Sequence, residues 1–173
     1  MKIRQATLDD FLGIRAVYED VLKNDVHNLT PYLEEITDEF IINELKNALA
    51  RGYAFVAEKD NEIVGYGKAY TGIFFKESHI LKNTTTIFSQ KCKNGIIPYR
   101  IMSFVINYIS ENMKNIKYLQ TMPYSFNTPI IRLLEKIGFQ KLFETKNTIK
   151  LSNGEYANEV FLQLEFTRKD DLK

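Results

Sequence analysis

One stretch of the chain carries only positive charge and leads into the parts of an anion-binding site. Between Ser78 and Ser110 there is no aspartate or glutamate, while four basic residues give the stretch a formal charge of +4 (Lys82, Lys91, Lys93 and Arg100). A predicted strand over 84–89 and a basic loop end at a glycine that opens a predicted helix, whose free amides and dipole attract anions. The pattern indicates a site for a phosphorylated ligand. The alternative is an ordinary strand-to-helix turn whose lysines face solvent.

Few other residues offer recognisable chemistry. The chain has no Ser/His/Asp set and no Walker-type loop. Two histidines and a single cysteine, Cys92, are too few for a typical zinc site. His79 is a candidate base, although a lone histidine in a loop is more often solvated or packed. The residue types alone therefore select no reaction.

The totals exclude several classes of protein. A net charge of +1 argues against a nucleic-acid coat. The sequence contains no apolar run near the roughly 20 residues of a membrane helix, and no signal-peptide core. One cysteine allows no internal disulfide and favours a reducing compartment. We therefore expect a soluble, cytoplasmic protein that acts without nucleic acid or membrane.

The clearest predicted element is a helix with both ends marked. Asn127 is a good N-cap residue, and Pro129 follows in the first turn. Apolar residues then recur at helical spacing (Ile130, Leu133, Leu134 and Ile137). Gly138 supplies a left-handed stop. Similar signals predict further helices over 11–22, 37–49 and 101–109, and strands over 2–6, 53–58, 62–70, 84–89, 116–122, 140–150 and 158–166. Residues 59–61 have the composition of a hairpin turn.

Three stretches together resemble a known family. Residues 127–139 read N-x(5)-L-L-E-K-x-G-F, which resembles N-x-x-A/S-x-x-L-Y/H-E-K-x-G-F, the last signature helix of the GNAT superfamily of N-acetyltransferases. Residues 53–70, YAFVAEKDNEIVGYGKAY, resemble the second and third strands of that family. The ending SNGEYANEVFLQLEF resembles its phosphinothricin and methionine sulfoximine acetyltransferase branch. The resemblance implies a single α/β domain over 1–173, with a mixed, splayed sheet of about seven strands, helices on both faces and a frayed tail at 167–173.

The resemblance also implies acetyl-CoA as co-substrate. The implied contacts are Phe88, Ser89, Gln90, Lys93, Asn94, Gly95, Ile96, Ile97 and Asn127, with a backbone amide near 88–90 polarising the thioester carbonyl. The pyrophosphate loop of the family, Q/R-x-x-G-x-G/A, is degenerate here. Cys92 replaces the Gln/Arg, Ile97 stands at a small-residue position and Pro98 lacks an amide. Each missing donor is expected to forfeit ~1–3 kcal/mol of binding, and Lys91 or Lys93 could compensate electrostatically.

Acid–base residues are harder to assign from the resemblance. Asn83 stands where that branch has its glutamate base, and Leu134 stands where a Tyr or His often protonates the leaving thiolate. The substitutes for the base are Glu77 or His79, Glu34 or Glu35, or a chain of water molecules, and Tyr124 is the first choice of acid. The implied acceptor-substrate region contains Glu34 and Glu35, and we add Phe74 from the aromatic loop after residue 70. For Glu34 and Glu35 a solvated loop is the alternative, and for Tyr124 it is simple packing.

Three hypotheses follow. The first is an acetyl-CoA-dependent N-acetyltransferase acting on the primary amine of a small molecule, amino-acid-like amines included. The second is a non-catalytic relative that binds a ligand or protein, which is favoured by the departures at Asn83, Ile97–Pro98 and Leu134. The third is a homodimeric module with the last strand at its interface.

Overall fold

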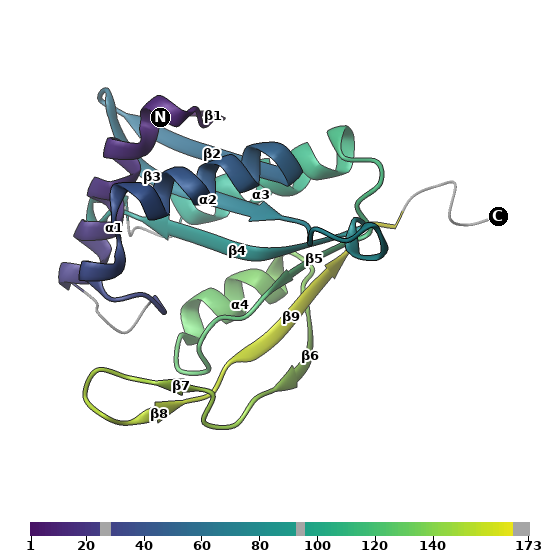
Figure 1. The fold of residues 1–173 in the computed structure, drawn as a ribbon. Helices are drawn as coiled ribbons and strands as arrows, with labels where there is room; N and C mark the ends of the chain where they lie inside the picture. Colours follow the sequence, from purple (N-terminus) through teal and green to yellow (C-terminus); the bar gives the residue numbers. More distant parts are fainter. Residues whose placement is uncertain (25–28, 93–95, 168–173) are drawn as a thin grey trace.

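The computed structural model describes residues 1–24, 29–92 and 96–167, and within them the chain forms a mixed sheet of seven strands. The strand order is β1-β2-β3-β4-β5-β9-β6, and β7 and β8 form a separate two-stranded ribbon (Figure 1). The strands are β1 (Lys2–Gln5), β2 (Gly52–Lys59), β3 (Glu62–Tyr70), β4 (Ile80–Phe88), β5 (Tyr118–Thr121), β6 (Gln140–Glu144), β7 (Ile149–Lys150), β8 (Tyr156–Ala157) and β9 (Val160–Glu165).

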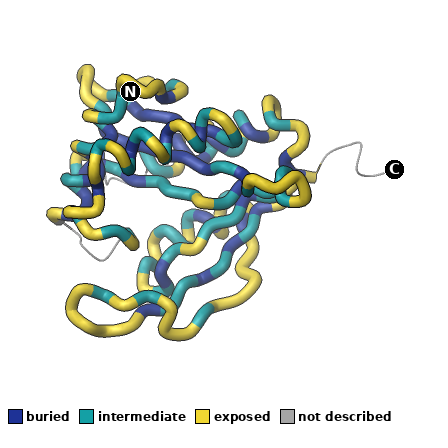
Figure 2. Tube along the Cα trace, viewed as in Figure 1, coloured by how far each residue is buried: buried dark blue, intermediate teal, exposed yellow. Residues whose placement is uncertain are grey.

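Four α-helices cover the two faces of this sheet. They are α1 (Phe11–Asn24), α2 (Asp38–Arg51), α3 (Ile96–Asn112) and α4 (Thr128–Lys136). Apolar residues of α1 and α2 pack with one side of β2 and β3, whereas α3 and α4 pack with the other side and with β5 and β9. Figure 2 shows the buried central strands and the exposed β7–β8 ribbon. The predicted α/β fold with helices on both faces is confirmed.

The β2–β3 hairpin follows directly from its turn residues. Asp60 and Asn61 have φ values of 52° and 65°, so both adopt the left-handed conformation. Aspartate and asparagine tolerate that conformation better than most residues, and a two-residue turn of this kind matches the twist of the strands. The hairpin turn predicted at 59–61 is confirmed.

The sheet splits between β4 and β5. These parallel strands pair at Ile80↔Tyr118 and Leu81↔Leu119, and no further pair joins them in the described part of the chain. Tyr70 pairs with Lys82 but Lys68 pairs with Thr85, so β4 carries an extra residue relative to β3. Asn83, at φ 54°, lies in this bulge. A bulge bends its strand, and β4 therefore diverges while β5 continues alongside β9.

Several predicted boundaries were wrong for local reasons. β4 begins at Ile80 rather than at residue 84, since the bulge at Asn83 interrupts its alternation without ending its pairing. Residues 140–150 form two strands instead of one, because the chain turns through Asn147 at φ 53°. Asn127 is the N-cap residue of α4, but with ψ at 59° its side chain makes no capping hydrogen bond. Gly138, at φ 106°, ends the helix as predicted.

A charged cluster fastens β1 to its neighbours. The Arg4 guanidinium donates two hydrogen bonds to the Asp10 carboxylate at 2.7 and 2.8 Å and contacts Glu58. The hydrogen bonds from Arg4 hold the pKa of Asp10 below its ordinary value of 3.8. Stability linked to this shift is present above pH 3.8 and lost as the pH falls through the lowered pKa.

Asp10→Asn is therefore expected to lower the free energy of unfolding at pH 7 by about 1–3 kcal/mol, since it removes a charge-assisted pair. Urea denaturation at pH 7 and near pH 3 measures the effect, and the difference from wild type should shrink at the lower pH. Asp9→Asn, at an exposed neighbouring position, is the matched control. A constant difference at both pH values would contradict the linkage.

No helix in the described ranges combines the length and apolar character needed to cross a bilayer.

Candidate active site

A cavity of about 620 Å³ opens where β4 and β5 separate. Its walls come from both faces of the sheet, so it passes through the split. Tyr18 of α1 and Phe40 of α2 line it on one face, and Met102 of α3 and Leu134 of α4 line it on the other. The divergence of two neighbouring strands thus connects spaces that an unbroken sheet would keep apart.

The end of the cavity between α3 and α4 is apolar. It is lined by Tyr53, Met102, Leu119, Ile130, Leu134 and Phe139. Leu134 is only 4% exposed and belongs to the main core cluster. No side chain of this group carries an acid or base that titrates near neutral pH. This end can bind an apolar chain.

Threonines of β4 line the middle of the cavity. They are Thr84, Thr85 and Thr86. The Thr84 hydroxyl donates to the Gln120 carbonyl across the split at 3.1 Å. Alternate backbone amides and carbonyls of a strand point to each side. From Lys82 onward the β5-facing edge of β4 has no strand partner in the described residues. This edge can donate backbone hydrogen bonds to a bound molecule.

Tyr124 stands at the other end of the cavity. Its hydroxyl donates to Thr30 Oγ1 at 3.0 Å, and the residue is 6% exposed. An isolated antiparallel bridge places it opposite Glu159. Burial raises the pKa of Tyr124, and the nearby Glu159 carboxylate adds to the shift. The phenol therefore keeps its proton at neutral pH, so it is a proton donor rather than a base.

A buried ion pair lies under α2, beside the cavity. Lys68 of β3 is 3% exposed, and its ammonium contacts Glu44 of α2. The Tyr70 hydroxyl donates to the other oxygen of Glu44 at 3.0 Å. Burial lowers the pKa of Lys68, and the Glu44 carboxylate opposes that shift. Lys68 of β3 lies opposite Thr85 of β4 in the sheet. The ion pair between Lys68 and Glu44 therefore holds α2 behind the part of β4 that lines the cavity.

The structure brings two predicted site residues to the cavity wall. Tyr124, the predicted acid, and Asn127, a predicted cofactor contact, both line it. Asn83, at the bulge of β4, also lines the cavity, and its side chain has no titratable group.

The two predicted bases lie outside the wall formed by the described residues. Glu77 is in an ion pair with Lys82, with 2.7 Å between Oε1 and Nζ. His79 packs its ring 6.2 Å from that of Tyr118, and its carbonyl accepts from the Lys117 amide at 2.9 Å. Their roles as base remain predictions.

The predicted acceptor-binding residues also lie away from this wall. Glu34 is exposed, and the Glu35 carboxylate accepts from the Tyr32 amide at 2.7 Å in a local turn. Phe74 is 68% exposed in the loop between β3 and β4. The acceptor-side wall is built instead by residues 29–31, just before that turn.

The predicted phosphate loop is described only in part. The Ser89 amide donates to the Val64 carbonyl, and the Gln90 amide donates to Asp20 Oδ2 at 2.8 Å. Neither amide is thus free to polarise a carbonyl, and Phe88, Ser89 and Gln90 do not line the cavity. Lys93, Asn94 and Gly95 lie outside the described residues, as does the side chain of Ile96. Ile97 packs against a small core cluster that contains Cys92 and Ile101, so its side chain is directed into the protein.

Sequence reasoning missed Glu159 and Phe161, which complete the wall from the start of β9. Thr30 and Pro31 also line the cavity, and they belong to the loop over 28–36 that the resemblance assigns to the acceptor-substrate pocket. Alternation along 159–164 places Glu159, Phe161 and Gln163 on one face, opposite the buried Val160, Leu162 and Leu164. That signal was present in the sequence, but it does not show that the polar face borders a cavity.

Comparison with known proteins identifies the family of this chain. The model of the acetyltransferase (GNAT) domain matches residues 3–160. No curated protein matches the chain. Among solved structures, a GNAT-family acetyltransferase from Streptococcus pneumoniae superimposes with a TM-score of 0.85 at 14% identity, covering 96% of this chain and 99% of the other.

Two further structures share the fold. The ribosomal-protein-alanine N-acetyltransferase of Brucella melitensis has a TM-score of 0.81 at 21% identity, with 95% and 99% of the two chains covered. A phosphinothricin acetyltransferase from Sinorhizobium meliloti, in complex with AcCoA, has a TM-score of 0.76 at 16% identity, with 95% and 88% covered. At these identities the structures establish the fold alone, but the family model spans nearly the whole described chain, and the protein belongs to the GNAT family of acetyltransferases.

Proposed function

We propose that the protein transfers the acetyl group of acetyl-CoA to the primary amine of a small molecule. The observation that carries the proposal is the cavity that passes through the split sheet. It offers two approaches to the same strip of β4, one between α3 and α4 and one beside α1, α2 and β9. A two-substrate transfer needs two such approaches, because donor and acceptor must meet at one carbonyl.

The described residues fit the apolar part of acetyl-CoA. Met102, Ile130 and Leu134 would contact its pantetheine arm, and the free edge of β4 would bond the amides of that arm. The N-terminus of α3, a helix of 17 residues, would face its phosphates. Because Ile97 packs into the protein, its large side chain would not block the approach of the phosphates. Acetyl-CoA supplies an activated acyl carbonyl when bound.

Transfer requires two proton movements, and the chain offers a donor for one. A C–N bond forms as the C–S bond breaks, the neutral amine gives up one proton and the departing sulfur gains one. An amine that binds as an ammonium first releases one further proton to a base or to solvent. Tyr124, protonated and on the cavity wall, is the proposed donor to the sulfur. Leu134 cannot serve there. Glu77 and His79, Glu34 and Glu35, or a chain of water molecules remain the candidates from the sequence for accepting the amine proton.

Two observations favour the non-catalytic alternative. Asp20 places a carboxylate on the Gln90 amide, at the start of the loop that would approach phosphates. Lys91, a predicted compensating cation, is in an exposed ion pair with Glu62 at 2.6 Å. A negative charge at the loop and a neutralised cation both weaken an anion site.

Calorimetric titration with acetyl-CoA, and with free CoA in parallel, separates these alternatives. We expect dissociation constants in the micromolar range, roughly −8 kcal/mol, for both ligands. Acetyl phosphate, which lacks the nucleotide and the pantetheine arm, is the ligand control and should give no heat. Absence of binding at about 1 mM acetyl-CoA would contradict the proposed function and support the non-catalytic alternative.

A further inference from the structure

We propose that Glu159 selects the acceptor, and that the acceptor is a protonated amine on an apolar body with no carboxylate beside the amine. The inference rests on the proposed acetyl transfer, and it departs from the amino-acid-like acceptor that the family resemblance favours.

The charges on the cavity wall carry the first step. Among the described lining residues, Glu159 is the one carboxylate and Lys82 the one cation. Lys82 already has a partner, because its Nζ lies 2.7 Å from Glu77 Oε1. The unbalanced charge of the described wall is therefore negative and sits at the Glu159 end. A cationic group is the complement of that charge.

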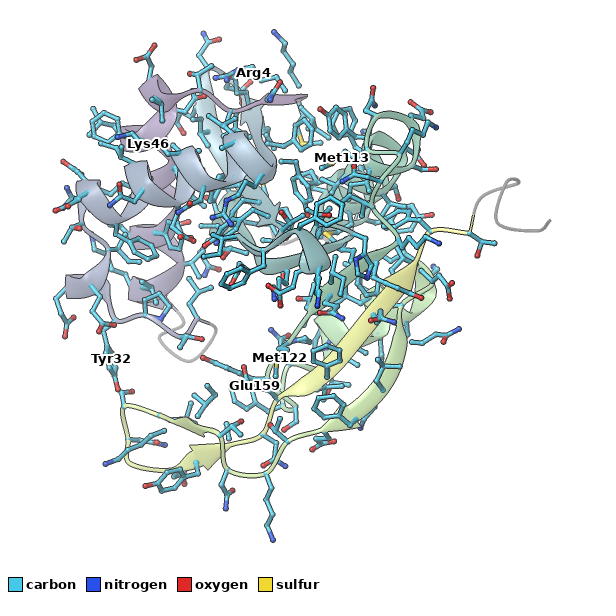
Figure 3. The ribbon with its side chains drawn as sticks, turned by 45° about the vertical axis from the view of Figure 1, so that its right-hand side comes forward. Arg4, Tyr32, Lys46, Met113, Met122 and Glu159 are labelled. Atoms are coloured by element: carbon cyan, nitrogen blue, oxygen red, sulfur yellow. The ribbon has the colours of Figure 1, made fainter. Side chains whose placement is uncertain are left out.

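The position of Glu159 carries the second step. Directly opposed residues of an antiparallel pair present their side chains on the same face, so Glu159 lies beside Tyr124. In the view of Figure 3, Glu159 and Met122 both appear where β9 begins, and both line the cavity. The Thr148 hydroxyl donates to Glu159 Oε2 at 3.2 Å and steadies the carboxylate. An ammonium bound to Glu159 would lie next to the proposed acid.

The other side chains that line the cavity indicate the chemical character of the rest of the acceptor. Leu29 and Pro31 line the cavity from the connection between α1 and α2, Phe40 lines it from α2, and Met122 and Phe161 line it from the sheet. Phe161 stacks on Phe143 at a centroid distance of 4.8 Å, which fixes its ring. Such walls favour an aliphatic or aromatic body over a polar one.

The same arrangement disfavours a free amino acid. Its carboxylate is on the carbon next to the amine, so binding the ammonium at Glu159 would bring two like charges together. Lys82 cannot relieve them. Leu81, its neighbour in β4, pairs with Leu119, and the five residues from there to Tyr124 span roughly 16 Å of extended chain.

Three ligands with one aromatic body test the inference: 2-phenylethylamine, L-phenylalanine and L-phenylalaninamide. The first two differ only by the carboxylate, and the amide restores its size without its charge. Equilibrium binding is measured by calorimetry, with and without CoA present. We expect 2-phenylethylamine and phenylalaninamide to bind at least about tenfold more tightly than phenylalanine.

Glu159→Gln should reverse this selectivity. The variant is expected to bind 2-phenylethylamine about tenfold more weakly, while phenylalanine binding stays equal or improves. Glu155→Gln, an exposed carboxylate in the turn between β7 and β8, is the matched control and should leave all three affinities unchanged. The comparison of ligands on the wild-type protein needs no variant, so it stands even if Glu159→Gln folds poorly.

Failure of this inference differs from failure of the proposed function. Equal affinity for phenylalanine and 2-phenylethylamine, an unchanged preference in Glu159→Gln, or no binding of any of the three overturns the inference. Acetylated product is then measured by mass spectrometry with acetyl-CoA present. The expected order of binding without any product would overturn acetyl transfer and leave the selection by Glu159 standing.

Discussion

Tyr124→Phe is expected to lower kcat for acetyl transfer by about a hundredfold, with little change in the KM for acetyl-CoA. The change removes one hydroxyl from a residue that is 6% exposed on the cavity wall. If the phenol protonates the departing sulfur, its loss affects the transition state and not the binding of the donor. Steady-state kinetics with a primary amine and acetyl-CoA measure both constants.

The pH profile separates a proton donor from a packing residue. Burial raises the pKa of Tyr124 above its ordinary value of 10.0, so the alkaline limb of the wild-type rate profile should fall only as the pH rises through that raised pKa. The variant should lack this alkaline limb. Tyr156→Phe, at a position 59% exposed on β8, is the matched control and should behave as wild type. An unchanged kcat in Tyr124→Phe would remove Tyr124 from the chemistry.

Glu44→Ala is expected to lower the free energy of unfolding by about 3–5 kcal/mol, the second large effect. The substitution leaves the Lys68 ammonium, which is 3% exposed, without the carboxylate that offsets its desolvation. It also removes the acceptor of the Tyr70 hydroxyl. Urea denaturation monitored by circular dichroism gives the free energy. Glu39→Ala, an exposed glutamate of the same helix, is the control.

Two further measurements test whether the unpaired charge of Lys68 causes this loss of stability. Burial lowers the pKa of Lys68 below its ordinary value of 10.5, and loss of Glu44 would lower it further. The folded state then favours the neutral amine, so the deficit of Glu44→Ala should narrow as the pH rises from the lowered pKa toward 10.5. The double variant Glu44→Leu/Lys68→Met should recover most of the lost stability, because it buries no charge. If Glu44→Ala lowered the free energy of unfolding by less than about 1 kcal/mol, the Lys68–Glu44 ion pair would be behaving as a solvent-exposed pair, and the expectation would be contradicted.

The fold could be predicted from the sequence because its signals are local. The left-handed turn at Asp60 and Asn61, and the helix that ends at Gly138, follow from backbone preferences of single residues. Their order along the chain then matches one family. Boundaries failed where a tertiary contact overrides a local signal. β4 continues through Asn83 because β3 pairs on both sides of the bulge, and no propensity of the residues around 83 encodes that pairing.

Two predicted site residues lie at the cavity, and both positions follow from local signals. Tyr124 and Asn127 are in the segment between β5 and α4 and line the cavity, while their roles stay predictions. Glu159 was missed because its importance depends on β9 pairing with β5, which brings residues from distant parts of the sequence together. The bases Glu77 and His79 are predicted from their nearness in sequence to β4, and their roles stay predictions. Glu77 pairs with Lys82, which lines the cavity.

The split in the sheet also has a mechanical consequence. Core side chains such as Leu81 and Leu119 pack across the line between β4 and β5, but only two residue pairs join the backbones there in the described chain. This line is a natural hinge between a body formed by β1–β4 and a smaller body formed by β5, β9, β6 and α4. A small rotation about Ile80 and Leu81 would widen or narrow the cavity, and it would also shift the core side chains that the two bodies share. We therefore expect the girth of a bound ligand to be coupled to the packing of that shared core.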